Sequence, residues 1–179
     1  MTSQDHQHQA AEMASGRQIR VAILTVSDTR TPETDVGGDL ADRLCREAGF
    51  AIAHREIVPD DAEAIRTQID GWLADDPPDA ILTTGGTGIA RRDTTIEVVR
   101  ECLEKELEGF GELFRMLSFD QVDAAAMLSR AVAGLAKPGP GSRADTFLFA
   151  MPGSPNAVET AMKRLIVPQL PHLIWERRR

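Results

Sequence analysis

The sequence predicts an α/β domain built on a mostly parallel sheet. Short apolar runs rich in strand-forming residues alternate along the chain with segments whose apolar residues recur at helical spacing. Strand, helix and strand in repeated order are typical of a parallel sheet with crossover helices. Ligands of such sheets bind beyond the carboxyl ends of the strands, so a functional site is expected in the segments that follow them.

Composition limits the class of protein. The 179 residues suit one domain, which we place over residues 18–175, after a polar tail, residues 1–17, that we expect to be disordered. The formal net charge of −8 argues against a nucleic-acid partner, because such proteins usually carry a basic surface. No apolar run reaches the roughly 18–20 residues that span a bilayer, and the N-terminus has no hydrophobic signal core. We therefore expect a cytoplasmic protein without a membrane partner, in which Cys45 and Cys102 are free thiols.

The first half of the chain gives the clearest strand and helix patterns. Apolar runs predict strands over Arg20–Ser27, Ile52–Val58 and Ala80–Thr84, the second at a sheet edge because it carries charged residues. Helical spacing predicts a helix over Gly38–Gly49. Another helix begins after Asp60 or Asp61, either of which can cap it.

The second half predicts further helices around one more strand. A helix over Glu108–Asp120 carries one apolar stripe, which indicates core or a subunit interface, and its Arg115 is expected to be a buried partner for a carboxylate. We also predict a helix of small residues over Ala124–Ala136, a strand over Thr146–Met151 and a closing helix over Asn156–Ile166. Arg177–Arg179 are expected to form a frayed, solvated tail.

A glycine-rich loop, TTGGTGIARRD over Thr83–Asp93, follows the third predicted strand and precedes a helix. Its glycines let backbone N–H groups turn toward an anion without a Cβ in the way, and the helix N-terminus adds positive potential. Arg91 and Arg92 add cations. The pattern indicates a phosphate site, although it matches neither a P-loop nor a dinucleotide fingerprint, and a tight strand-to-helix turn is the alternative.

Asp93 ends this loop, and its ordinary role would be to cap the helix. However, Thr94 and Glu97 form the pattern of a capping box, which would leave the Asp93 carboxylate free. A free carboxylate beside a phosphate site repels phosphate unless a divalent cation lies between them. Because Mg²⁺ is commonly held by one or two carboxylates together with substrate phosphates, Asp93 is a candidate metal or nucleotide residue.

Two other segments follow strands and contain candidate residues. Asp35 is either a second catalytic carboxylate or the N-cap of the helix that ends at Gly49, and the sequence leaves both interpretations open. Pro152-Gly153-Ser154-Pro155 follows the last predicted strand, with Ser154 as N-cap and Pro155 in the first helical position. The helix that begins there offers a second N-terminus to an anion.

These motifs together resemble the MoaB/MogA family of molybdenum cofactor biosynthesis. The resemblance rests on TTGGTGIARRD, on D-x-x-G at Asp35–Gly38 and on MPGSP at Met151–Pro155, and it runs from about Arg20 to Leu170. EGFGELFRMLSF and SRAVAGLA are similar to the MoaB branch in particular. The resemblance implies a three-layer α/β/α fold of the molybdopterin-binding kind, assembled as a homo-oligomer, either a trimer or a hexamer.

The same resemblance implies a reaction and a set of site residues. The reaction is adenylylation of molybdopterin by Mg-ATP, which gives adenylyl-molybdopterin and pyrophosphate. Asp35 and Asp93 would be the catalytic carboxylates that hold Mg²⁺. The nucleotide- and pterin-binding residues would be Thr84, Gly85, Gly86, Thr87, Gly88, Arg92, Gly153 and Ser154. Active members often have proline where Ile96 stands, but this chain keeps Arg92-Asp93, which favours activity; the alternative is a non-catalytic molybdopterin-binding or scaffold protein.

Overall fold

The computed structural model describes residues 17–139 and 145–179. Residues 1–16 of the tail expected to be disordered lie outside these ranges, as do residues 140–144 of the loop between the last two strands. None of the described helices is both long and apolar enough to span a bilayer. Cys45 and Cys102 are buried free thiols, as expected.

Six strands form one mixed sheet, with the order β2-β1-β3-β6-β5-β4. The strands are β1 (Arg20–Val26), β2 (Ala51–Val58), β3 (Ala80–Thr84), β4 (Leu103–Glu106), β5 (Val132–Ala136) and β6 (Phe147–Met151). The first four in spatial order run parallel, whereas β5 and β4 pair antiparallel to their neighbours. The predicted mostly parallel sheet is therefore confirmed, with β2 at an edge.

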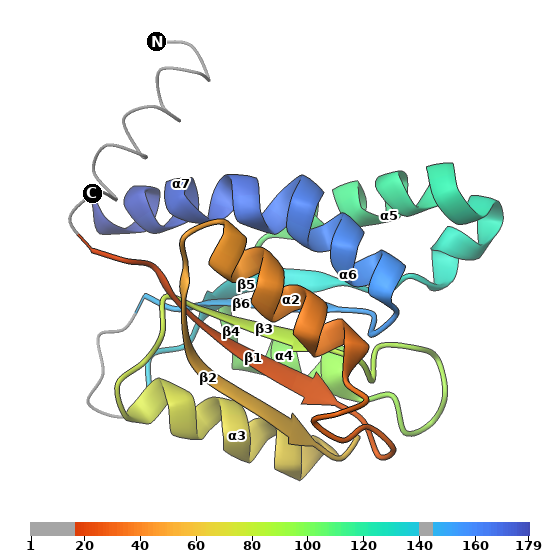
Figure 1. Cartoon of the computed structure of the whole chain (residues 1–179), viewed down its shortest axis with the longest axis horizontal. Helices are drawn as coiled ribbons and strands as arrows, with labels where there is room; N and C mark the ends of the chain where they lie inside the picture. Colours follow the sequence, from red (N-terminus) through yellow and green to blue (C-terminus); the bar gives the residue numbers. More distant parts are fainter. Residues whose placement is uncertain (1–16, 140–144) are drawn as a thin grey trace, which may run out of the picture.

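Helices cover both faces of the sheet (Figure 1). One layer contains α2 (Val36–Glu47), α5 (Glu108–Val122), α6 (Pro155–Ala161) and α7 (Val167–Arg178), and the other contains α3 (Ala62–Ala74) and α4 (Thr95–Cys102). Side chains alternate along β1, so that Val21 and Ile23 join the core under the first layer while Ala22 and Leu24 join the core under the second. The three-layer α/β/α fold is confirmed.

The helix predicted over Ala124–Ala136 is wrong. A 3₁₀ helix, η2 (Asp123–Leu128), is followed by the buried strand β5. The local propensity of this alanine-rich segment favours a helix. In the folded chain, however, Gly134 lies so close to β4 that a Cβ there would clash with the Lys105 carbonyl oxygen. Strand pairing at this edge of the sheet therefore overrides local helix propensity.

The C-terminal helix is longer than predicted. It runs on from α6 through a π-helical segment, η3 (Met162–Ile166), into α7, which ends at Arg178. The expectation of a frayed arginine tail is corrected by two ion pairs, from Arg178 to Asp79 at 2.5 Å and from Arg177 to Asp145 at 2.7 Å. These pairs fasten the last helical turn to residues at the amino ends of β3 and β6.

Candidate functional site

The candidate site is built where parallel strands end at one edge of the sheet. In Figure 1 the loops that follow β1 and β3 lie at the same end of the sheet, and the turn before α6 lies near them. The glycine loop, residues 85–93, follows β3 directly, and Gly153 and Ser154 follow β6. A Cβ on Gly153 would come within 3.1 Å of the Gly85 Cα atom, so these two turns pack directly against each other.

The first two glycines of the loop are required by its shape. Gly85 has φ +96° and Gly86 has φ +60°, a region that residues with a Cβ rarely adopt. The Gly85 N–H donates to the Met151 carbonyl at 3.1 Å, which closes the turn against β6. A Cβ on Gly85 would clash with the Val26 carbonyl oxygen, so only glycine fits at this position, where the loop passes the end of β1.

A run of three backbone amides, unpaired within the described part of the chain, follows in the loop, and Thr87 in its middle is 4% exposed. Among the residues that the structure describes, no acceptor pairs with the N–H groups of Gly86, Thr87 or Gly88. The Gly86 carbonyl accepts from the Thr95 N–H at 3.0 Å, and this bond ties the loop to the first turn of α4. Successive free N–H groups in a glycine-rich turn form a typical binding site for phosphate oxygens.

Asp93 lies outside α4, as predicted, but not because a capping box forms. Its Oδ2 accepts the Ala90 N–H at 2.8 Å, and a Cβ on Gly88 would lie 2.6 Å from that oxygen. Thr94 is the N-cap residue, yet its hydroxyl makes no capping hydrogen bond, and Glu97 pairs with Arg130 at 2.5 Å instead. The capping box is therefore wrong, and the Asp93 carboxylate lies beside the glycines with one oxygen engaged by Ala90; its metal or nucleotide role stays a prediction.

Asp60 is a carboxylate at this site that the sequence interpretation treated only as a possible helix cap. A Cβ on Gly86 would lie 2.9 Å from its Oδ1, and this oxygen is buried without a hydrogen-bond partner. Burial raises the pKa of Asp60, and the negative charge of Asp93 raises it further, while the Thr94 N–H acts in the opposite direction. Asp61 caps α3 by accepting the Ala64 N–H at 2.9 Å. One cap is sufficient for α3, so the other of these two adjacent aspartates is free for a different role. This was the signal in the sequence that could have identified Asp60.

Arg92 is paired with another acidic residue of the site. Its guanidinium forms an ion pair with Asp28, which follows β1. Asp28 also accepts the backbone N–H of Asp60 at 3.2 Å, so it joins the segment after β1 to the segment after β2. Arg92 therefore lies at the site, but in this state its charge is balanced by a carboxylate.

Asp35 has every carboxylate oxygen engaged within the protein. It is 2% exposed, and its Oδ1 accepts the Gly38 N–H at 2.9 Å as the N-cap of α2. Its Oδ2 accepts from the Thr25 hydroxyl at 2.8 Å and from Arg55 at 2.9 Å. This geometry favours the N-cap interpretation that the sequence left open, and the catalytic and metal-binding roles of Asp35 stay predictions.

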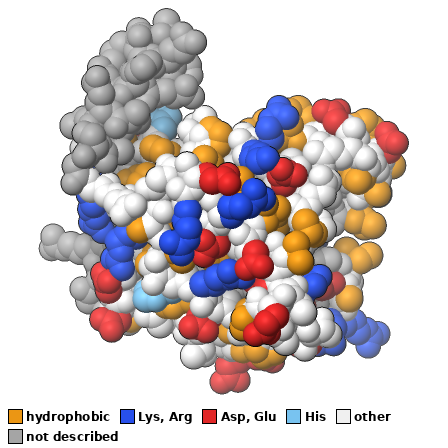
Figure 2. Space-filling model, viewed as in Figure 1, with side chains coloured by type: hydrophobic (Ala, Val, Ile, Leu, Met, Phe, Trp, Pro, Cys, Tyr) orange, Lys and Arg blue, Asp and Glu red, His pale blue; other side chains and the backbone are white. Residues whose placement is uncertain are grey.

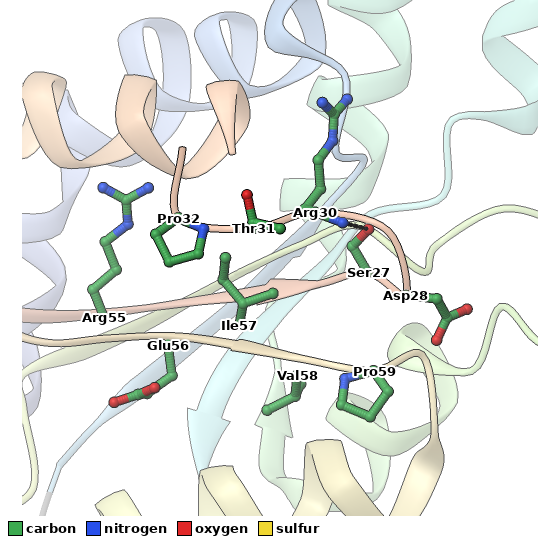
Figure 3. A pocket seen from close by; sticks show the side chains of 10 residues that line it. All are labelled: Ser27, Asp28, Arg30, Thr31, Pro32, Arg55, Glu56, Ile57, Val58 and Pro59. Carbon is green, nitrogen blue, oxygen red and sulfur yellow. Dashed lines mark hydrogen bonds between the residues drawn. The ribbon is translucent and has the colours of Figure 1, made fainter. Parts of the chain in front are cut away.

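A hollow of about 640 Å³ lies beside the edge strand β2. It is lined by Ser27, Asp28, Arg30, Thr31, Pro32, Arg55, Glu56, Ile57, Val58 and Pro59. Figure 3 shows Arg30 and Arg55 extending to the same side of the ribbon, whereas Glu56 points to the other side. No motif in the sequence indicated this hollow, and the glycine loop does not line it; Asp28 belongs to its wall and links it to Asp60 and Arg92.

The arrangement suits a cation that is completed by its substrate. Within residues 17–139 and 145–179, no three side chains of His, Cys, Asp or Glu gather as ligands for a metal ion. Asp60 and Asp93 do lie against adjacent parts of the glycine loop, and the unpartnered buried oxygen of Asp60 fits an oxygen-seeking cation. Mg²⁺ takes one or two carboxylates plus phosphate oxygens and water, which is the donor set available here.

Comparisons with known proteins agree with the fold. Residues 22–172 match the family model described as Probable molybdopterin binding domain. Molybdenum cofactor biosynthesis protein B of Staphylococcus carnosus is 51% identical over 179 residues, covering 98% of each chain. The protein of the same name from Bacillus subtilis is 43% identical, covering 100% of this chain and 99% of its own.

Solved structures give the same result. A crystal structure of Molybdenum cofactor biosynthesis protein B superposes with a TM-score of 0.83 at 45% identity, covering 91% of this chain and 98% of the other. The tungsten cofactor synthesizing protein MoaB from Pyrococcus furiosus gives a TM-score of 0.81 at 32% identity, with coverage of 91% and 99%. The chain thus belongs to the molybdopterin-binding-domain family, among the MoaB/MogA proteins that its loop motifs resemble.

Proposed function

We propose that this chain acts in molybdenum cofactor biosynthesis, as a Mg-ATP-dependent adenylyltransferase that modifies molybdopterin. The role in cofactor biosynthesis is supported by the family and by the names of relatives that match this chain over nearly their whole length. The reaction itself is our inference from the loop motifs and from the geometry around them.

The proposed reaction joins two anions. An oxygen of the terminal phosphate of molybdopterin attacks the α-phosphorus of ATP and forms a new P–O bond. The bond between the α-phosphorus and the bridging oxygen breaks, and pyrophosphate leaves with that electron pair. Such a reaction is accelerated mainly by holding the reacting groups in line and by neutralising their charge.

The observation that carries the proposal is the set of three free amides flanked by two carboxylates. The N–H groups of Gly86, Thr87 and Gly88 can bind phosphate oxygens, and they stay fixed because Gly85 and Gly86 are bonded to β6 and α4. Asp60 lies against Gly86 and Asp93 against Gly88. These acidic groups would repel a phosphate, so the loop binds one well only with a cation between them.

We propose that Asp60 and Asp93 hold Mg²⁺ at this loop. When bound, Mg²⁺ supplies positive charge to the phosphates and removes their repulsion from the carboxylates. Asp60 would provide the buried Oδ1 that has no partner, and its raised pKa would fall when a cation approaches. Asp35 is less suited to this part, since its oxygens already bind Thr25, Gly38 and Arg55.

The larger hollow is a suitable place for a ring system of one substrate. Its volume of about 640 Å³ lies within the range of small-molecule sites, roughly 300–1,000 Å³. Ile57, Val58 and Pro59 give it an apolar wall. Arg30 provides positive charge, whereas Arg55 is already paired with two carboxylates. Asp28 connects this wall with the carboxylate site, which would allow one extended substrate to reach both.

We further expect copies of this chain to associate through α5 and η2, as a trimer or a hexamer. Large apolar side chains are exposed there, namely Leu113, Met116, Phe119, Val122, Met127 and Leu128. Figure 2 shows hydrophobic side chains at the end of the molecule where these elements lie. A contiguous apolar surface is typical of an interface between subunits.

An assay with labelled ATP, Mg²⁺ and molybdopterin tests the proposed reaction. The proposal predicts adenylyl-molybdopterin and pyrophosphate in equal amounts, with neither formed when Mg²⁺ is chelated. The alternative of a non-catalytic binding or scaffold protein predicts that molybdopterin raises the melting temperature while no pyrophosphate appears. Pyrophosphate release by wild-type protein and its loss in Asp93→Asn would separate the two.

A further inference from the structure

A second, smaller cavity lies between α4, α5 and the segment that enters β5. It has a volume of about 140 Å³ and is lined by Ile96, Arg100, Arg115, Met127, Ser129, Arg130 and Ala131. Three of these residues are arginines that come from separate parts of the chain. A cavity of this size holds several waters or a small hydrated ion, since one water needs only about 10–15 Å³ of such space.

The charges around this cavity do not balance. Arg130 pairs with Glu97 at 2.5 Å, and Arg100 pairs with Glu106 at 3.3 Å. Arg115 forms neither an ion pair nor a hydrogen bond with any residue that the structure describes. Contrary to the expectation from sequence, Arg115 is exposed and has no carboxylate partner. Of the three arginines that line the cavity, Arg115 alone therefore has no carboxylate partner among the described residues.

The backbone gives the Arg115 side chain room to lie over its own helix. A Cβ on Gly111 would be 3.1 Å from Nη1 of Arg115 and 2.7 Å from the Ala131 carbonyl oxygen. The guanidinium is thus folded back over α5, beside the segment that leads into β5. Gly111 clears the space that this position requires.

We propose that this cavity binds a small oxyanion of the phosphate or sulfate class, with Arg115 as the principal cation. A guanidinium presents parallel N–H groups that match two oxygens of such an anion, and a charge-assisted bond of this kind is stronger than a neutral one. The Ser129 hydroxyl at the cavity wall can add a further donor. The site does not depend on the proposed adenylylation, and because Arg115 and Met127 lie on α5 and η2, the anion would lie beside the expected contact between copies of the chain.

The cavity adjoins the glycine loop without being part of it. Arg130, which forms one wall, donates to the carbonyl oxygens of Thr87 at 2.8 Å and Asp93 at 3.3 Å. The loop amides of Gly86, Thr87 and Gly88 are separate donors that could also attract phosphate. An experiment must therefore distinguish the arginine cavity from the glycine loop.

Calorimetric titration of inorganic phosphate into the full chain, at constant ionic strength, tests the proposal. We expect one phosphate per chain, with affinity at least about tenfold weaker in Arg115→Gln, because a charged hydrogen bond contributes roughly 1.5–3 kcal/mol. Arg164→Gln is the matched control, since Arg164 is also an exposed helical arginine and forms no ion pair with a described residue. Its phosphate affinity should be unchanged. In Asp93→Asn, which removes a charge that repels phosphate from the loop, the added substitution Arg115→Gln should still weaken phosphate affinity by about tenfold.

Three results would overturn the proposal. Absence of phosphate binding to the wild type is the first, and equal weakening in Arg115→Gln and Arg164→Gln is the second, because it would indicate unspecific screening. The third is binding that is tighter in Asp93→Asn and unaffected in Arg115→Gln, since this would place the anion on the glycine loop. Melting curves of each variant verify that a loss of binding is not a loss of fold.

Discussion

Two aspartates, each in the segment between a strand and the helix that follows it, have opposite environments. Asp35 precedes α2 after β1, and its buried carboxylate has a partner on each oxygen. Asp60 precedes α3 after β2, and its Oδ1 is buried with no partner. Buried polar groups are nearly always paired, so a satisfied carboxylate serves the fold, while an unsatisfied one indicates a ligand. We therefore propose a structural role for Asp35 and a ligand-binding role for Asp60.

The largest expected effect is on catalysis. Replacing Asp60 or Asp93 by Asn should lower adenylyl transfer by at least about a hundredfold, because each removes charge that holds the cation at the phosphates. Pyrophosphate release measured at saturating Mg²⁺ checks this expectation. Asp70→Asn, an exposed aspartate on α3, is the control and should retain wild-type rates. Wild-type turnover in Asp60→Asn would remove Asp60 from the site.

The next effect concerns folding. Asp35→Ala should lower the free energy of unfolding by about 2–4 kcal/mol, because it removes the cap of α2 and leaves the buried Thr25 hydroxyl without its acceptor, while Arg55 keeps Asp39 as a partner. Asp39→Ala is the matched control, since Asp39 contacts the same Arg55 at 2.7 Å but its side chain is 59% exposed. Exposed pairs contribute about 1 kcal/mol or less. Urea unfolding checks this expectation. Equal losses of unfolding free energy in Asp35→Ala and Asp39→Ala would contradict it.

A smaller effect, of opposite sign, is expected at Asp60. Because folding raises the pKa of Asp60, its protonated form favours the folded state, and this contribution is lost as the pH rises through the raised pKa. Asp60→Asn should therefore melt at a higher temperature than the wild type at neutral pH without Mg²⁺. The difference should disappear as the pH falls well below about 4, the ordinary pKa of aspartate, because the carboxyl group is then protonated in both the folded and the unfolded state. A variant that melted lower at every pH would show that Asp60 stabilises the fold.

Much of the fold could be predicted because its first half consists of local signals. The runs that became β1 and β3 are apolar, the run that became β2 carries the charges of an edge strand, and all are bounded by signals such as the cap Asp61 and Gly49, which has φ +82°. β5 could not be predicted, since its five small, buried residues acquire their strand geometry from pairing with β4 and β6. Long-range pairing is not encoded in the spacing of the residues themselves.

Part of the candidate site could likewise be predicted from the sequence, and part could not. The glycine loop and Asp93 carry a local pattern, and the structure places Gly85 of this loop beside Gly153, as their positions after β3 and β6 suggested. Asp60 was missed because its role depends on which of two adjacent aspartates caps α3, and on the contact with Gly86 across the sheet edge. The prediction that Arg115 pairs with a carboxylate was wrong. The sequence gives no indication that its guanidinium folds back over Gly111.

The most direct test of the account is calorimetric titration of ATP with and without Mg²⁺ into the wild type and Asp60→Asn. The wild type should bind ATP much more weakly without Mg²⁺, because Asp60 and Asp93 repel its phosphates at the glycine loop. Asp60→Asn should show a smaller dependence on Mg²⁺, since one of the repelling charges is gone. Equal affinity of the wild type for ATP in the presence and absence of Mg²⁺ would contradict the account.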